Sequence, residues 1–348
     1  MSENFFLDRE LDCRNTVDRI LEELPHYAVD FFIGIENTTS PLTRKNYAYD
    51  LRIFFQFLSE KVYRNKRMAD ITLSDLESLS PATLERFLSY LSLYKIGDKI
   101  MQCKEEAKSR KLATIRSFYK YFFNRDRITV NVAAKISMPK LHEKEIIRLE
   151  HEEMTGLLDV VTTGTGLSSR QLKHHENSCL RDVAIITLFL GTGIRISELV
   201  SLNVDDIDFS VNGFRVTRKG GNRVILYFSD EVAEALGAWM DVRRVNEKLP
   251  KDEQALFISG QNRRITTRAV QNIVKKYSQI NTPLKHITPH KLRSTFGTNL
   301  YHDTGDIYVV ADVLGHSDVN TTKRHYAAIT DEIRRNAVKN VKLKQDDE

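Results

Sequence analysis

The stretch TRKNYAYDLRIFFQFL, residues 43–58, places apolar side chains at steps of three and four residues. This period predicts an amphipathic helix with one buried face. Residues 84–91 and 112–122 repeat the pattern. The first part of the chain, residues 1–138, is therefore predicted to be a helical domain.

The polar faces of these predicted helices carry many cations. For a single helix, a solvated surface is the simpler explanation. Two such faces in one domain make a surface that follows nucleic-acid phosphates more plausible. The candidate nucleic-acid contacts are Arg44, Lys45, Lys108, Arg110, Lys111 and Arg116.

Residues 139–148 begin at Pro139 and have no clear periodicity, so we interpret them as a linker to a second domain, residues 149–348. In that domain we expect an apolar helix over 182–190, a second helix from Ile194, and an exposed loop over 162–178. Residues 214–217 and 224–228 predict a β-hairpin with RKGGNR as its turn. Thr288 and Pro289 predict a helix start, and Gly315 a helix end. The predicted fold class is mainly α with a small antiparallel sheet.

Composition excludes several classes of protein. The 348 residues are 41% hydrophobic and 28% charged, as in a soluble protein of about two domains. The longest uncharged run, residues 183–194, is far shorter than the about 20 apolar residues that a membrane-spanning helix needs. The N-terminus is charged from its third residue and resembles no secretory signal. Three scattered cysteines form neither a disulfide nor a zinc pattern, so we expect a cytoplasmic protein.

The net charge is only weakly informative. Lys and Arg number 52 and Asp and Glu 47, which gives +5. This favours a polyanionic partner only if the cations are concentrated on one surface. We then expect the acidic residues mostly on outer surfaces, away from that partner.

Five of the ten histidines lie between residues 286 and 325, which suggests a metal site. His286 and His290 are separated by the predicted helix start, however, so their rings should not share one helical face. No Glu stands where a zinc-hydrolase helix needs its base. We predict no metal site and no other cofactor.

Another set of residues fits phosphoryl transfer. Arginines bind non-bridging oxygens with two N–H groups, a lysine or histidine can protonate a departing oxygen, and a tyrosine can form a covalent phosphoester. Each member alone has an ordinary explanation, such as a surface ion pair or a solvated turn. The set, in chain order, is Arg195, Lys219, His290, Arg293, His316 and Tyr326.

This order resembles the tyrosine recombinase, or phage integrase-like, family. GTGIRISELVSL (191–202) is similar to its first arginine box, RKGGNR (218–223) to its hairpin lysine, TPHKLRSTF (288–296) to its HxxR box, and VLGHSDVNTTKRHY (313–326) to its tyrosine box. The resemblance covers residues 147–330 and extends, less specifically, over a helical core-binding domain. ILEELPHYAVDFF (20–32) and the polar insertion before Arg181 are closest to single-component Xer-type recombinases.

The resemblance implies an α+β catalytic domain that forms, with the core-binding domain, a C-shaped clamp around DNA. Tyr326 would attack the scissile phosphate and form a 3′-phosphotyrosine with a free 5′-hydroxyl. Arg195 and Arg293 would hold the non-bridging oxygens, and Lys219 would protonate the leaving 5′-oxygen. The covalent link keeps the phosphodiester energy, so the resemblance implies neither ATP nor a divalent metal.

The supporting residues are implied in the same way. His290 would assist proton transfer at the tyrosine, His316 would bond a phosphate oxygen, and Glu198 would orient Arg195. The chain departs from the family at Ser294, where histidine is frequent. A second departure is the pair of alanines after Tyr326, where Tyr-x-His or Tyr-x-Arg is common. His325 is expected to be structural. None of these departures falls on the six catalytic positions.

The segment DEIRRNAVKNVKLK, residues 331–344, predicts a last amphipathic helix with a basic face. It could pack on its own domain, but the resemblance favours docking into a neighbouring protomer of a homotetramer on two DNA duplexes. A swapped tail also argues against a type IB topoisomerase. The complete residue set argues against an inactive DNA-binding accessory protein.

The resemblance leaves two biological roles open. One is chromosome dimer resolution in cell division, with a cell-division DNA translocase as partner. The other is integration or excision of a mobile element. The helical pattern begins within the first 50 residues, which leaves no extra arm-binding domain and favours the chromosomal role.

Overall fold

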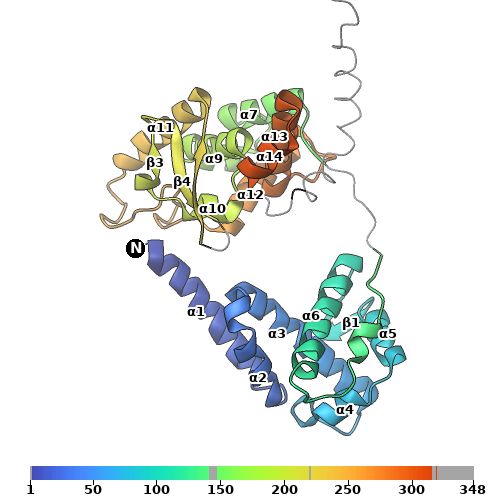
Figure 1. Cartoon of the computed structure of the whole chain (residues 1–348). Coiled ribbons are helices and arrows are strands. Elements are labelled where there is room, and N and C mark those ends of the chain that lie inside the picture. Colours follow the sequence, from blue (N-terminus) through green and yellow to red (C-terminus); the bar gives the residue numbers. More distant parts are fainter. Residues whose placement is uncertain (1, 141–146, 219–220, 316–318, 320–348) are drawn as a thin grey trace, which may run out of the picture. The chain divides into compact units, whose positions relative to one another are not determined.

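Two units make up the chain, Glu3–Lys144 and a C-terminal unit that begins at Glu145 (Figure 1). The division falls within the predicted linker. The structure is a computed structural model that describes residues 2–140, 147–218, 221–315 and 319. Within these ranges no helix has the length and apolar character needed to cross a membrane.

Helices form most of the N-terminal unit. Ser40, Thr72 and Ser80 each cap a helix, because their hydroxyls accept a hydrogen bond from the N–H three residues on. The helices are α1 (Ser2–Leu21), α2 (Tyr27–Gly34), α3 (Pro41–Phe57), α4 (Leu73–Glu77), α5 (Pro81–Tyr90) and α6 (Glu105–Phe123). Shorter helical turns are η1 (Glu36–Thr38), η2 (Leu58–Val62), η3 (Met68–Asp70) and η4 (Val132–Lys135).

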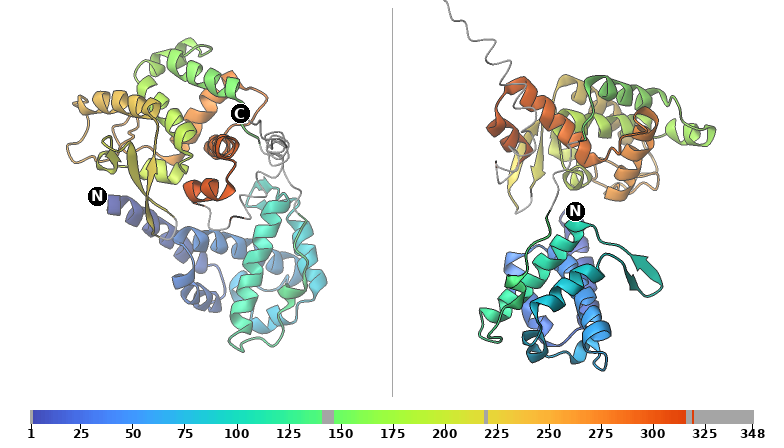
Figure 2. Two further views of the ribbon diagram at one scale, coloured as in Figure 1. Left: turned by 45° about the horizontal axis from the view of Figure 1, so that its top comes forward. Right: turned by 90° about the vertical axis from the view of Figure 1, so that its right-hand side faces the viewer.

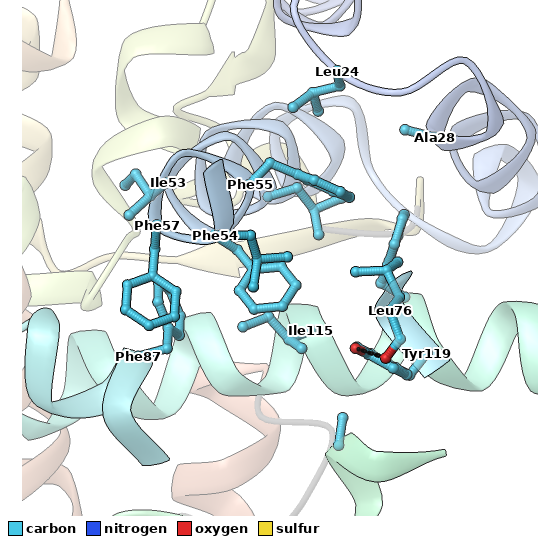
Figure 3. Close-up of a cluster of buried hydrophobic side chains, with 14 of the residues drawn as sticks. Leu24, Ala28, Ile53, Phe54, Phe55, Phe57, Leu76, Phe87, Ile115 and Tyr119 are labelled. Carbon is cyan, nitrogen blue, oxygen red and sulfur yellow. Dashed lines mark hydrogen bonds between the residues drawn. The ribbon is translucent and has the colours of Figure 1, made fainter. Parts of the chain in front are cut away.

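The apolar faces of these helices meet in an aromatic core (Figure 3). Phe54 of α3 meets Phe87 of α5 edge to face, with ring centroids 5.2 Å apart, a favourable arrangement for two aromatic rings. Tyr119 of α6 is buried as well, and its hydroxyl donates to the carbonyl of Leu76 at 2.9 Å. The helix predicted from the 43–58 period is confirmed.

A β-hairpin of the N-terminal unit was not expected from the helical periods. It consists of β1 (Tyr94–Ile96) and β2 (Lys99–Met101), which pair antiparallel. Gly97 occupies the turn with a φ of 56°, a left-handed conformation that glycine adopts without strain. The hairpin projects from the helices (Figure 2).

The C-terminal unit is built around one apolar helix, α9, which packs against α7, α11 and α13. Its helices are α7 (His151–Thr163), α8 (Ser169–His175), α9 (Cys179–Thr192), α10 (Ile196–Ser201), α11 (Asp230–Arg244), α12 (Thr267–Asn281), α13 (Pro289–Thr304) and α14 (Ile307–Leu314). A turn, η5 (Val204–Asp206), precedes the sheet.

The sheet has the order β3 (Ile207–Asp208), β4 (Gly213–Thr217), β5 (Arg223–Tyr227), all antiparallel. The predicted hairpin is therefore confirmed, and β3 adds a short edge. The predicted mainly α fold with small antiparallel sheets is confirmed as well.

The prediction of a loop over 162–178 is wrong in part, because α8 lies inside it. Ser168 and Gln171 form a capping box that starts α8, each side chain accepting from the other's backbone N–H. At the end of α8, His175 is buried, and its Nδ1 lies 3.0 Å from the hydroxyl of Tyr277 in α12. This contact docks α8 on the domain.

Candidate active site

The turn between α9 and α10 places Arg195. Gly193 ends α9 in the left-handed conformation, with a φ of 60°. A Cβ atom there would come within 2.4 Å of Phe296 and 2.9 Å of Leu314, so only glycine fits this close approach. Arg195 follows two residues later as the N-terminal cap of α10.

Glu198 fixes Arg195 twice. One carboxylate oxygen accepts from the backbone N–H of Arg195 at 3.0 Å, and the other accepts from Nη1 at 2.8 Å. The Glu198 side chain is only 5% exposed and that of Arg195 is 33% exposed. The buried acid thus presents a guanidinium that can still be reached from outside. The contact is the one that the i, i+3 spacing predicts.

The start of α13 places the HxxR pair. The Thr288 hydroxyl accepts from the N–H of Lys291, and Pro289 occupies the first turn, so the predicted helix start is confirmed. His290 is exposed at this turn, whereas Arg293, one turn further on, is buried. The guanidinium of Arg293 donates to the carbonyls of Gly193 and Leu314.

The C-terminal end of α14 is where the arginines converge. Helix ends leave carbonyl groups without helical partners, and these carbonyls carry partial negative charge. Arg195 Nη2 donates to the carbonyl of Gly315 at 2.8 Å, next to the Leu314 carbonyl that Arg293 binds. Gly315 ends α14 with a φ of 61°, as predicted. Helices α13 and α14 lie side by side in Figure 1.

A third arginine joins them from the sheet. Arg218, directly after β4, donates to the carbonyls of Asp312 at 3.1 Å and Val313 at 2.7 Å. Three guanidinium groups therefore bind four consecutive carbonyls, those of residues 312–315. Sequence reasoning missed Arg218, although it stands beside Lys219 in RKGGNR.

The described residues thus bring Arg195, Glu198 and Arg293 together, with His290 on the exposed first turn of α13. The other predicted catalytic residues are Lys219, His316 and Tyr326, and they lie outside the described residues. The same holds for His325 and for the predicted last helix.

The cations predicted to contact DNA form hydrogen bonds or ion pairs with other residues of the N-terminal unit. Arg44 donates to the carbonyls of Glu36 and Thr39, and Arg116 to those of Ala133 and Ile136. Lys45 and Lys108 form ion pairs with Asp12 at 2.7 Å and Glu105 at 2.9 Å.

Arg110 and Lys111 share one buried acid, Asp50 of α3, whose side chain is 0% exposed. The Arg110 side chain is 46% exposed, and its guanidinium binds both carboxylate oxygens. The prediction that Lys111 contacts DNA does not agree with its burial: its side chain is 6% exposed, and its ammonium lies 2.7 Å from Asp50. It points into the domain instead of toward a DNA surface.

Family comparisons cover both units. Residues 148–332 match the phage integrase family, and residues 30–126 match the phage integrase N-terminal SAM-like domain. The chain is similar to tyrosine recombinase XerC of Caldanaerobacter subterraneus subsp. tengcongensis, at 33% identity over 338 residues, which cover 94% of this chain and 88% of XerC. It is similar to tyrosine recombinase XerS of Streptococcus mutans, at 30% identity over 346 residues, which cover 91% of this chain and 95% of XerS.

A solved structure supports the fold. The XerH site-specific recombinase bound to palindromic difH substrate, in a post-cleavage complex, matches with a TM-score of 0.67 and 18% identity. The match covers 93% of this chain and 88% of XerH. The family match and the sequence matches to XerC and XerS, which cover most of each chain, show the family. The chain belongs to the phage integrase family and is a site-specific tyrosine recombinase homologous to the Xer proteins.

Proposed function

We propose that the chain cleaves and rejoins duplex DNA through a 3′-phosphotyrosine intermediate and exchanges strands through a Holliday junction. One observation carries this proposal: Arg195 and Arg293, on different helices, converge on the turn after α14. In the sequence this turn leads to His316 and then Tyr326. The two arginines that would hold the phosphate therefore bind the turn that directly precedes, in the sequence, the segment with the proposed nucleophile.

Arg195 has N–H groups that can donate to a phosphate. A guanidinium has five N–H groups, and the bonds of Arg195 to Glu198 and Gly315 use two of them. The Gly315 carbonyl carries no formal charge and orients the guanidinium without neutralising it, whereas the Glu198 carboxylate offsets part of the Arg195 charge. Two such cations stabilise the extra negative charge of a five-coordinate phosphorus in the transition state.

The remaining roles complete the reaction. An unperturbed tyrosine has a pKa of about 10, so a base is needed: the Tyr326 hydroxyl loses its proton to His290 as its oxygen bonds phosphorus. The bond from phosphorus to the 5′-oxygen breaks, and Lys219 gives that oxygen a proton. His316 bonds a phosphate oxygen. Because the phosphotyrosine keeps the bond energy, rejoining reverses these steps without ATP or a metal.

For the DNA contacts of the N-terminal unit, we propose Arg110 first. Its side chain is about half exposed, and Asp50 fixes the orientation of its guanidinium. Arg44, Lys45, Lys108 and Arg116 would assist at the edges of that surface.

The proposed role is chromosome dimer resolution in cell division, by a homotetramer on two DNA sites and with a DNA translocase as partner. Relatives named XerC and XerS, which match over most of their length, support this role over integration or excision of a mobile element.

The Tyr326→Phe variant tests the chemistry. Genomic DNA fragments that stay bound to this variant would be sequenced to identify the recombination site. A nicked copy of that site would then trap any covalent protein–DNA adduct. Wild-type protein should form the adduct in EDTA and without ATP, and Tyr326→Phe should form none. A normal adduct with Tyr326→Phe would refute the nucleophile.

The retained fragments also test the role. A single inverted-repeat site near the replication terminus supports dimer resolution. Sites at the ends of a mobile element support integration instead. Relaxation of any supercoiled plasmid, without sequence preference, would indicate a topoisomerase.

A further inference from the structure

Arg218 reaches the active site from the hairpin, although the proposed reaction assigns it no task. Its backbone is fixed in the hairpin turn: its N–H donates to the carbonyl of Asn222 at 2.8 Å, and its carbonyl accepts from the N–H of Gly221 at 3.0 Å. Its side chain is fixed by α14, through the carbonyls of Asp312 and Val313. One residue therefore ties the hairpin end to the α14 end.

Gly315 makes room for this contact. A Cβ atom at residue 315 would lie 2.3 Å from Nη1 and 2.4 Å from Cζ of Arg218. The guanidinium can therefore lie against the backbone of residue 315 only because that residue is glycine. The same glycine has a positive φ and offers its carbonyl to Arg195. Arg218 thus contacts the same turn to which Arg195, a proposed phosphate-binding residue, donates a hydrogen bond.

The acceptors of Arg218 keep the site positive. Burial lowers the pKa of Arg218, because a guanidinium loses hydration there. The carbonyls at a helix C-terminus compensate with partial negative charge, and the carboxylates of Glu198 and Asp312 favour the charged guanidinium as well. Arg218 therefore adds its positive charge to those of Arg195 and Arg293.

We propose that Arg218 is a positioning residue that holds the hairpin end on the α14 turn and so brings Lys219 to the leaving 5′-oxygen. Consecutive Cα atoms are only about 3.8 Å apart, so a fixed Arg218 restricts where Lys219 can lie. The inference rests on the proposed function, in which Lys219 supplies the proton as the bond from phosphorus to the 5′-oxygen breaks.

Single-turnover cleavage of two nicked substrates tests this role. One substrate has the ordinary 5′-oxygen, and the other has sulfur at that bridging position, which leaves as a thiolate and needs no proton. The variants are Arg218→Ala, Lys219→Ala and a control, Arg215→Ala. Arg215 lies in β4, three residues before Arg218, is exposed, and donates to the carbonyl of Asp205 at 3.1 Å. Its loss removes the same charge without touching α14.

We expect Arg218→Ala and Lys219→Ala to slow cleavage of the oxygen substrate by about 100-fold or more, the usual contribution of a general acid. The sulfur substrate should restore both to near the wild-type rate. Arg215→Ala should behave as wild type on both substrates.

Two results would overturn the inference. In one, Arg218→Ala cleaves the oxygen substrate at the wild-type rate. In the other, it stays slow on the sulfur substrate while Lys219→Ala recovers, which would mean that Arg218 acts on the phosphate clamp. If Arg218→Ala does not fold, Arg218→Lys replaces it, with a smaller oxygen defect and full recovery on sulfur expected. Wild-type protein that cleaves neither substrate would instead refute the proposed function.

Discussion

Asp50 is the buried acid that two cations of α6, Arg110 and Lys111, share. Its side chain is 0% exposed and accepts from Arg110, Lys111 and Thr114. Asp50→Asn keeps the shape but leaves the Lys111 ammonium buried without a counter-ion. Breaking a buried ion pair in this way costs about 3–5 kcal/mol. We expect the free energy of unfolding to fall by that order, measured by urea denaturation.

Asp70→Asn is the matched control, since Asp70 pairs with Arg67 at 2.8 Å on the surface. Exposed pairs contribute little to stability, so this variant should unfold like wild type. Equal stability of the Asp50 and Asp70 variants would contradict the structural role of Asp50.

The burial of Asp50 could be predicted from the sequence, because it stands three residues after Tyr47 and four before Phe54, on the apolar face of α3. Its partners on α6 could not, since they depend on how two helices pack. The same division holds in the active site. Arg195 and Arg293 could be predicted from their sequence motifs. Their main-chain acceptors at residues 314 and 315 could not, because any residue type has a backbone carbonyl.

At the scale of elements, a polar network joins α8, α9 and α12. The hydroxyl of Tyr277 donates to the buried carboxylate of Asp182 at 2.8 Å and lies 3.0 Å from Nδ1 of His175. Tyr277→Phe removes both bonds and leaves two buried polar groups without that partner. We expect a loss of about 1–3 kcal/mol in the free energy of unfolding, measured by thermal denaturation.

Tyr227→Phe is the control for this network, because Tyr227 of β5 is 67% exposed and the same hydroxyl is removed. Its unfolding temperature should match wild type. An equally stable Tyr277→Phe variant would show that α8 docks by other contacts.

The elements missed from the sequence have weak or short signals. Helix α8 has a capping box but a mostly polar sequence, so no apolar period marks it. The β1–β2 hairpin has strands of three residues, although the Gly97–Asp98 turn between β-formers is a readable sign. The longer elements, α3, α9 and the β4–β5 hairpin, follow from period and turn chemistry.

For the whole molecule, the small net charge of +5 does not describe how charge is placed. Asp50, Asp182 and Glu198 are exceptions to the expectation that acids lie mostly on outer surfaces, because they are buried beside cations. Such acids orient cations, and orientation matters for a phosphate more than the total charge does.

The proposed homotetramer would exchange the strands, and residues 331–344 are the proposed link between its protomers. Their sequence period predicts a helix with Ile333, Ala337 and Val341 on one face. Replacing Ile333 and Val341 with serine should weaken cooperative binding to DNA with two sites, measured by gel shift. Binding to a single site should not change.

The control replaces Arg335 and Lys339 with serine, on the opposite side of the same predicted helix. If the apolar face docks into a neighbouring protomer, cooperativity survives in this control and falls in the Ile333 and Val341 variant. If the helix packs on its own domain, the apolar variant loses single-site binding and stability together, because the protomer itself is damaged. Comparing the two binding curves therefore separates assembly from folding.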